Sequence, residues 1–268
     1  MFVPFIRGAG VSFAMIKSDL KTQRDVLSNY ASAAPYPTVF VHGAGENNLL
    51  WKKTLERLSG SSQAFAVNLP GHPSGEITCK SVPEYSQAVL EFIQQKGIRS
   101  PVVAGHSMGS AVAITLAIEH PEVVRGLVVV SGGAKLGVER TVLEGLRSQA
   151  MKTIENVITP MSFYAVDLSI GKEARSSLST SNLQVFLNDY LACAAFDERQ
   201  RLERIRARTL VVCGDADRMT PPKWAHYLQS NIEGAELRFI RDAGHMLPIE
   251  KPDLLAGMIQ AFLEGFSR

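Results

Sequence analysis

Cysteine and long apolar runs are scarce in this chain of 268 residues. The three cysteines, Cys79, Cys193 and Cys213, are odd in number and widely spaced, which argues against a disulfide framework and against a metal site. No apolar run approaches the roughly 18 residues that a membrane-spanning helix needs. We therefore expect a protein without a metal, a disulfide or a membrane span, in a reducing, cytoplasmic setting.

The chain also lacks a clear excess of positive or negative charge. The chain has 28 Lys and Arg against 26 Asp and Glu, a formal net charge of +2, which is too close to balance to indicate nucleic acid or a membrane surface as a partner. The basic residues of 197–208 alternate with acids, as on a solvated helix face. With 46% hydrophobic and 20% charged residues, the composition is typical of a folded globular protein.

The first residues include an apolar stretch, 8–16, that has to be distinguished from a signal peptide. Ala31-Ser32-Ala33 is similar to a signal-peptidase site, but the charged residues 17–29 separate it from the apolar stretch. A cleavage site follows the apolar core closely, so we predict no signal peptide. We interpret 2–7 and 11–17 as two opening strands, antiparallel to each other.

Short apolar runs alternate with helical patterns along most of the chain. The runs end at glycine or at turn residues, as buried strands do. Such strands are expected at 38–41, 64–67, 101–104, 123–130, 209–213 and 237–240. Strands that alternate with helices predict an α/β fold with a doubly wound, mostly parallel sheet.

Three of the helical patterns have clear signatures. Trp51, Leu55 and Leu58 recur at helical spacing, and Ser81-x-x-Glu84 is a capping box that begins a second helix. The last helix has proline in its first turn. Its apolar face consists of Leu254, Leu255, Met258, Ile259, Phe262, Leu263 and Phe266.

Residues 135–206 depart from this alternation. They show helical patterns and no convincing strand, and about seventy residues exceed an ordinary crossover between two strands. We predict that they form a helical cap, inserted after the sixth strand. It would lie over the carboxyl ends of the strands, where ligands bind in such sheets. Residues 1–134 and 207–268 would then form the core domain.

The strongest motif is Gly105-His106-Ser107-Met108-Gly109, between an expected strand and an expected helix. It matches G-x-S-x-G in the strand–turn–helix setting that this motif requires. A serine on such a turn has a strained backbone that holds its hydroxyl out of the sheet, and the crowded positions two residues away must be small. We predict that Ser107 is a nucleophile, the alternative being a structural turn.

A serine hydroxyl is a poor nucleophile unless a base accepts its proton, so one of the six histidines is expected nearby. His245 follows the last strand, on a loop at the same edge of the sheet as Ser107, and is predicted to be the base. The alternative is a histidine that only structures its loop. Other roles are indicated for His42 at a strand end, His72 in a turn, His106 beside the serine, His120 at a helix end and His226 within a helix.

An acid is expected to orient the histidine and to stabilise its charged form. Asp215 and Asp217 both follow the strand 209–213. Asp215 is placed to bond backbone amides within the turn. Asp217 lies further out, where it can reach another loop, and we favour it. The corresponding turn after the preceding strand, 131–133, has no acid.

A tetrahedral intermediate also needs hydrogen-bond donors for its oxyanion. The first expected donor is the backbone amide of Met108, the residue after the nucleophile. The second is expected in His42-Gly43-Ala44-Gly45, where glycines let the chain turn an amide inward, and Ala44 is the candidate. A plain glycine turn is the alternative.

These motifs together resemble the α/β-hydrolase superfamily, and within it the capped esterase-like group. The resemblance extends over nearly the whole chain, from the Ala44 loop through Leu69-Pro70-Gly71-His72 to Gly244-His245. The order of nucleophile, acid and histidine also agrees. It implies the α/β-hydrolase fold and no cofactor. It also implies a catalytic triad of Ser107, Asp217 and His245, with Ala44 and Met108 as the oxyanion hole.

Departures from relatives narrow the choice within the superfamily. Haloalkane dehalogenases and epoxide hydrolases have aspartate where this chain has Ser107. Carbon–carbon bond hydrolases usually have asparagine and tryptophan where this chain has His106 and Met246. These differences favour an esterase over all three activities.

We therefore predict a serine hydrolase that cleaves carboxylic esters through an acyl-enzyme. Thioester, lactone or amide cleavage and perhydrolysis remain alternatives on the same triad, and a non-catalytic ligand receptor is an alternative of another class. The substrate is expected to be a small-molecule ester with an apolar acyl or alcohol group, because the predicted cap has no basic clamp. Apolar and aromatic residues of this segment include Met151, Met161, Phe163, Tyr164, Phe186 and Tyr190. The sequence favours no particular oligomeric state.

Overall fold

A computed structural model describes residues 26–32, 36–58, 62–73, 75–76, 79–164 and 182–266 of the chain. The strands predicted at 2–7 and 11–17 lie outside the described residues. Among the described residues, seven strands form one sheet in the order β1-β3-β2-β4-β5-β6-β7. They are β1 (Val26–Ser32), β2 (Thr38–Val41), β3 (Ser62–Val67), β4 (Val102–His106), β5 (Gly126–Val130), β6 (Arg208–Gly214) and β7 (Glu236–Ile240).

The sheet is mostly parallel, as predicted. Only β1 runs antiparallel to its neighbour, β3, among the described pairings, whereas each pair from β3 across to β7 is parallel. The sequence analysis missed β1, which includes Ala31 and Ser32 of the tripeptide considered as a cleavage site. The other strands match the predicted runs to within three residues at each end.

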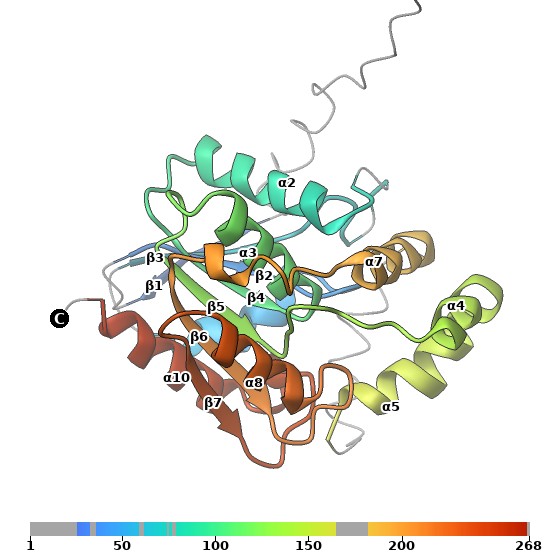
Figure 1. Ribbon diagram of the computed structural model, residues 1–268. Helices are drawn as coiled ribbons and strands as arrows, with labels where there is room; N and C mark the ends of the chain where they lie inside the picture. Colours follow the sequence, from blue (N-terminus) through green and yellow to red (C-terminus); the bar gives the residue numbers. More distant parts are fainter. Residues whose placement is uncertain are drawn as a thin grey trace, which may run out of the picture.

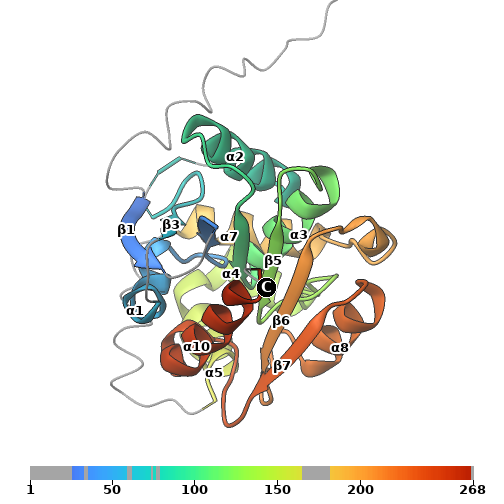
Figure 2. The same ribbon diagram turned by 90° about the vertical axis from the view of Figure 1, so that its left-hand side faces the viewer.

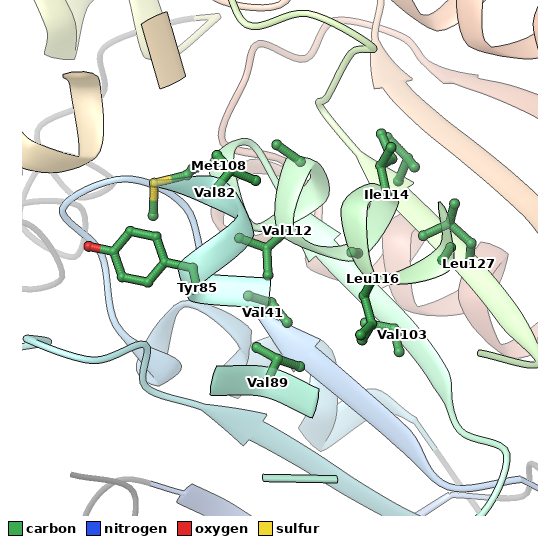
Figure 3. Packing of buried hydrophobic residues seen from close by; sticks show 14 of the residues in the cluster. Val41, Val82, Tyr85, Val89, Val103, Met108, Val112, Ile114, Leu116 and Leu127 are labelled. Atoms are coloured by element: carbon green, nitrogen blue, oxygen red, sulfur yellow. The ribbon is translucent and has the colours of Figure 1, made fainter. Parts of the chain in front are cut away.

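Helices cover both faces of the sheet (Figures 1 and 2). One face carries α2 (Val82–Gln95), α3 (Met108–Glu119) and α8 (Pro222–Asn231), whose side chains share one hydrophobic cluster with the sheet. Figure 3 shows the part of this cluster around Val112 of α3 and Val41 of β2. The other face carries α1 (Lys52–Arg57) and α10 (Pro252–Glu264). The sheet is therefore doubly wound.

The three helices with clear sequence signatures form, with small differences. A 3-10 turn, η3 (Asn48–Trp51), precedes α1, and Trp51, Leu55 and Leu58 are buried. Ser81 caps α2 by accepting the Glu84 amide at 3.4 Å. On α10, Leu254 is 54% exposed, so its predicted place on the apolar face is wrong. It lies in the first turn of α10, where it lines a surface pocket with Leu210 of β6 and Arg238 of β7.

The described residues between β5 and β6 form helices joined by loops and contain no strand. They form α4 (Arg140–Thr153), the π-helix η4 (Ile154–Ile158), α5 (Thr159–Ser162), α7 (Leu183–Ala195) and the 3-10 turn η5 (Leu202–Arg204). We call α4, η4, α5 and α7 the inserted helices; Figure 1 shows α4, α5 and α7 together beyond one end of the strands. They follow β5, the fifth described strand. The boundaries predicted for a cap, 135 and 206, stay a prediction.

A buried carboxylate attaches α7 to the rest of the molecule. Asp189 of α7 is fully buried, and its Oδ1 accepts the hydroxyl of Tyr85 of α2 at 2.7 Å. Its Oδ2 lies 2.8 Å from Nε2 of His72, in the loop after β3. Isolated buried charges are costly, so this carboxylate needs a charged partner.

His72 is that partner, because both of its ring nitrogens face acceptors. Nε2 faces Asp189, and Nδ1 lies 3.2 Å from the carbonyl oxygens of Leu69 and Pro70. A ring with two acceptors must carry a proton on each nitrogen, which makes it an imidazolium. Burial alone would lower the pKa of His72, but Asp189 and the two carbonyls raise it above its ordinary value.

The raised pKa of His72 predicts how stability depends on pH. A histidine with a raised folded-state pKa contributes stability that is fully present below about pH 6.5 and is lost as the pH rises through the raised value. We expect the free energy of unfolding to fall on the alkaline side of about pH 6.5, and His72→Gln to reduce this fall. Urea titrations over this range measure it.

His226→Gln is the matched control, because His226 lies exposed on α8. It should leave the slope of unfolding free energy against pH as it is in the unmodified protein. Equal slopes for His72→Gln and the unmodified protein would contradict an ion pair at this position.

Candidate active site

Ser107 lies on a sharp turn between β4 and α3, in a backbone conformation that few side chains adopt. Its φ is +52° and its ψ is −117°, and its amide donates to the carbonyl of Val130 in the neighbouring strand at 3.0 Å. Such a strained residue persists only where its surroundings hold it in place. The turn matches the strand–turn–helix setting predicted for a nucleophile.

The glycines of the motif are required by close backbone contacts. A Cβ added at Gly105 would lie 2.1 Å from the carbonyl oxygen of Gly109, and one added at Gly109 would lie 2.3 Å from that of Val41. Real Cβ atoms do not come so close to backbone atoms. This geometry of the turn therefore requires glycine at both positions, where the sequence analysis expected small residues.

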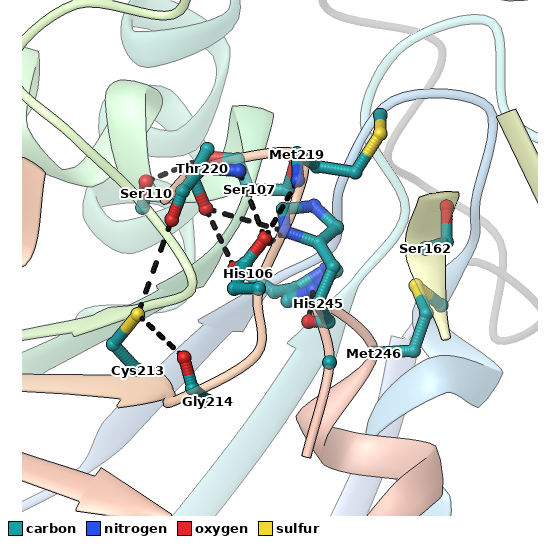
Figure 4. Close-up of polar contacts among 12 residues, drawn as sticks. His106, Ser107, Ser110, Ser162, Cys213, Gly214, Met219, Thr220, His245 and Met246 are labelled. Atoms are coloured by element: carbon teal, nitrogen blue, oxygen red, sulfur yellow. Dashed lines mark hydrogen bonds and ion pairs between the residues drawn. The ribbon is translucent and has the colours of Figure 1, made fainter. Parts of the chain in front are cut away.

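Asp217 and His245 form a buried pair. Nδ1 of His245 lies 2.9 Å from Oδ2 of Asp217, and each residue is 3% exposed. Thr220 completes the arrangement, because its hydroxyl donates to the same carboxylate oxygen at 2.8 Å and lies 3.2 Å from Nδ1 of His245 (Figure 4). The Asp217 carboxylate is an acceptor, so the proton of the imidazole belongs on Nδ1 and leaves Nε2 as the basic nitrogen.

Asp217 also does what the sequence analysis assigned to Asp215. Its Oδ1 accepts the amides of Met219 at 2.9 Å and of Thr220 at 2.8 Å, whereas the side chain of Asp215 is exposed. The turn role predicted for Asp215 is therefore wrong. Burial alone would raise the pKa of Asp217, but His245 and the Thr220 donors hold it below its ordinary value. The group is an anion that can stabilise a positive imidazole.

Backbone hydrogen bonds hold the His245 loop against the inserted helices. The His245 amide donates to the carbonyl of Ser162 in α5 at 2.9 Å. Glu250, at the end of α9 (Leu247–Glu250), accepts the amides on both sides of the histidine, Gly244 at 3.2 Å and Met246 at 3.1 Å. The same carboxylate accepts the amide of Tyr164 at 2.8 Å. These hydrogen bonds therefore fix the His245 loop to the end of α5.

His106 connects the Ser107 turn to the His245 loop. Its Nε2 donates to the carbonyl oxygen of His245 at 3.0 Å, and the two rings are 4.9 Å apart between centroids. Figure 4 shows Ser107 and His245 in the same small region of the molecule. Among the described residues, no hydrogen bond joins the Ser107 hydroxyl to His245. Such bonds are often long in unliganded enzymes and shorten when substrate binds.

The loop that contains Ala44 lies against the Ser107 turn. A Cβ added at Gly43 would lie 3.1 Å from the Cβ of Ser107. The amides of Ala44 and Met108 donate no hydrogen bond to any residue in the described part of the chain. Met108 begins α3, where the first amides of a helix have no partner within the helix. The turn and the loop therefore bring two unpaired amides close to Ser107.

The remaining predicted histidine roles can be compared with the structure. His42 structures its loop, because its Nδ1 donates to the Gly43 carbonyl at 2.8 Å and its Nε2 accepts the Leu69 amide at 3.0 Å. Burial and the neighbouring His72 keep the pKa of His42 well below its ordinary value. His120 ends α3, and His226 is exposed on α8, as predicted.

Several residues around the site were not found from the sequence. Thr220 follows Asp217 by three residues, which is the spacing of an acid that bonds backbone amides in a turn, so that signal was present. Glu46, Asp189 and Glu250 had no comparable signal. Their partners are distant along the chain or are backbone amides, which no motif reveals.

Apolar side chains of the inserted helices lie over the loops of the site. Partly buried Ala44 and Met219 pack against a cluster formed by Leu146, Ile154, Ile158, Phe186 and Tyr190. Of the aromatic and methionine residues singled out in this segment, Phe163 is also buried, whereas Met151 and Tyr164 are about half exposed.

Among the described residues, no group of His, Cys, Asp and Glu could hold a metal ion. None of the helices formed by these residues has the length and apolar character that a membrane span requires.

Several known proteins with similar sequences are esterases by name, and a putative carbamate hydrolase of Azorhizobium caulinodans is also similar. A pimeloyl-[acyl-carrier protein] methyl ester esterase of Neisseria meningitidis serogroup B is 26% identical over 239 residues, which cover 84% of this chain and 92% of the relative. The esterase of the same name from Vibrio cholerae is 30% identical over 223 residues, which cover 77% and 86%.

Comparison of structures agrees in fold. An esterase from Exiguobacterium antarcticum superimposes with a TM-score of 0.81 at 16% identity, over 89% of this chain and 94% of that chain. The sequence model of the alpha/beta hydrolase family matches residues 38–258, which include every loop of the site described above. The parallel sheet, the serine turn and this match together show that the chain belongs to the alpha/beta hydrolase family.

Proposed function

We propose that the protein is a serine hydrolase that cleaves carboxylic esters. The observation that carries this proposal is the buried pair of His245 and Asp217 on a loop held against the Ser107 turn. The esterase names of the relatives support it. In this proposal Ser107, Asp217 and His245 are the catalytic triad, and the reaction requires no cofactor.

In the first step, the Ser107 hydroxyl attacks the ester carbonyl while Nε2 of His245 takes its proton. Nδ1–H of His245 stays bonded to the Asp217 carboxylate, which offsets the positive charge that forms on the ring. The amides of Ala44 and Met108 hold the oxyanion of the tetrahedral intermediate. Each such donor typically contributes about 3 kcal/mol to the transition state.

Collapse of this intermediate breaks its bond to the alcohol oxygen and completes the first half of the reaction: His245 gives the proton to the leaving alcohol, and the acyl group remains on Ser107. Water then enters, His245 removes a proton from it, and the resulting tetrahedral intermediate releases the acid and free Ser107. The same amides hold the oxyanion in both halves.

The inserted helices are proposed to act as the cap of the site and to bind the apolar part of the substrate. Ala44 and Met219, which flank the reacting groups, share one apolar cluster with Phe186 and Tyr190 of α7. An aliphatic acyl or alcohol group is the occupant that these surroundings favour.

Replacing the nucleophile is the direct test. Ser107→Ala removes the attacking oxygen, so we expect turnover of p-nitrophenyl butyrate to fall by at least about 10⁴-fold with the fold retained. A fluorophosphonate probe should label the unmodified protein at Ser107, as shown by peptide mass spectrometry, and should not label the variant.

Ser148→Ala is the control, because Ser148 is exposed on α4 away from the reacting groups. It should keep both turnover and labelling. Retention of most activity by Ser107→Ala would refute the proposed nucleophile. Absence of labelling and turnover in the unmodified protein would favour a ligand receptor.

A panel of esters tests the proposed apolar group. Each methylene that enters an apolar pocket contributes about 0.8 kcal/mol, or roughly fourfold in kcat/KM. We expect kcat/KM to rise with acyl length from acetate until the pocket is filled, and to be lower for an acyl chain that ends in a carboxylate. A thioester and a lactone of the preferred acyl chain rank the alternative reactions. A flat series, or a preference for the charged chain, would count against this pocket.

A further inference from the structure

Two buried carboxylates bind the backbone amides on either side of Ala44. Oε2 of Glu46 accepts the amide of Gly43 at 2.6 Å, and Oδ2 of Asp189 accepts the amide of Gly45 at 2.8 Å. Glu46 is 3% exposed and Asp189 is fully buried. The amide between them, that of Ala44, has no hydrogen-bond partner in the part of the chain that the structure describes.

Each carboxylate is paired with a buried histidine. Nδ1 of His106 lies 3.1 Å from the same Glu46 oxygen that accepts the Gly43 amide, and Nε2 of His106 donates to the His245 carbonyl. His72 pairs with Asp189 through the oxygen that accepts the Gly45 amide. A charged acceptor makes a shorter and stronger hydrogen bond to an amide than a neutral one.

The backbone at this loop has little freedom to move. Gly45 has φ of +68°, and a Cβ added there would lie 2.1 Å from the ring of Phe186. Phe186 and Asp189 both belong to α7, which closes over the loop from the side of the inserted helices. On the other side, Glu46 and His106 join the loop to the Ser107 turn. The loop is therefore held from two independent directions.

We propose that Glu46 and Asp189 are positioning residues, which fix the amides of Gly43 and Gly45 and thereby aim the free amide of Ala44 at the oxyanion. This inference rests on the proposed function. In this proposal α7 both positions a donor of the oxyanion hole and lines the substrate pocket. A donor that is fixed before the reaction stabilises the transition state without the cost of reorienting it.

Asp189→Ala removes the acceptor of the Gly45 amide, and Asp189→Asn keeps an oxygen that can accept it. We expect Asp189→Ala to lower kcat by about 10- to 100-fold, less than the loss of an oxyanion donor itself, with little change in KM. Binding of phenylboronic acid, which forms a tetrahedral adduct with a nucleophilic serine, should weaken by a similar factor. Asp189→Asn should recover most of both losses.

Rates are divided by the amount of Ser107 that a fluorophosphonate labels, so that misfolded protein does not count. Asp197→Ala is the matched control, because Asp197 lies just beyond α7 and pairs with Lys135 at 3.2 Å, away from the Ala44 loop. It should keep the kcat of the unmodified protein. A merely structural role of Asp189 would lower the melting temperature and leave kcat per labelled serine unchanged, which would overturn the proposal.

A measurement on the unmodified protein is informative even if Asp189→Ala does not fold. Amide hydrogen exchange followed by NMR should show slow exchange at Gly43 and Gly45 and faster exchange at Ala44. Equal exchange at Gly45 and Ala44 would overturn the proposal, and it would leave the proposed hydrolase activity intact if Ser107 is labelled. If Ser107 is not labelled, the proposed function itself fails.

Discussion

One hydrogen bond, from Nδ1 of His245 to the carboxylate of Asp217, is the interaction on which the rest of the site depends. Both groups are buried, and a buried carboxylate is tolerated only when donors surround it. Thr220 and the turn amides supply these donors, and the ring of His245 supplies the last one. This contact assigns the proton to Nδ1 and leaves Nε2 free to act as a base. Without it, the ring would have no defined tautomer.

The inserted helices are joined to the site by polar contacts as well as by apolar packing. Asp189 of α7 binds the loop that follows β2, and the end of α5 binds the loop that follows β7 through Ser162 and Glu250. Arg218, next to Asp217, donates to the carbonyl of Phe163 at 2.9 Å. The loops that follow β2, β6 and β7 are therefore each coupled to the helices that would surround the substrate.

The buried histidines have different roles, and the hydrogen-bond partners of each ring show which role it has. His42 faces one donor and one acceptor and is neutral, whereas His72 and His106 face acceptors with both nitrogens. Burial alone would lower the pKa of His106, but Glu46 and the His245 carbonyl raise it. Two positive rings thus compensate two buried carboxylates, and only His245 keeps a free nitrogen near Ser107.

Much of the fold and the positions of the proposed triad could be predicted from the sequence. Ser107, Asp217 and His245 each follow a strand whose apolar run is plain, and parallel strands bring such positions to one edge. β1 could not be found, because an antiparallel edge strand has no continuous apolar run to mark it. Leu254 shows that an apolar residue at helical spacing can still face solvent.

Glu46 and Asp189 could not be predicted, because pairing is decided by tertiary structure. The Gly45 amide and Asp189 are 144 residues apart, and nothing in the local sequence of either indicates the contact. The histidine partners of the two carboxylates, His106 and His72, are 60 and 117 residues away along the chain, and both carboxylates also accept backbone amides, which no motif reveals. The roles of the predicted triad and oxyanion donors likewise stay predictions until chemistry is observed at Ser107.

A crystal structure of the protein inactivated by a phenylboronic acid tests the central claim most directly. We expect boron bonded to the Ser107 oxygen, and one boronate oxygen bonded to the amides of Ala44 and Met108. Nε2 of His245 should contact another boronate oxygen while Nδ1 remains on Asp217. An adduct on another residue, or a Ser107 adduct whose oxygens avoid both amides and the His245 ring, would contradict the proposed active site.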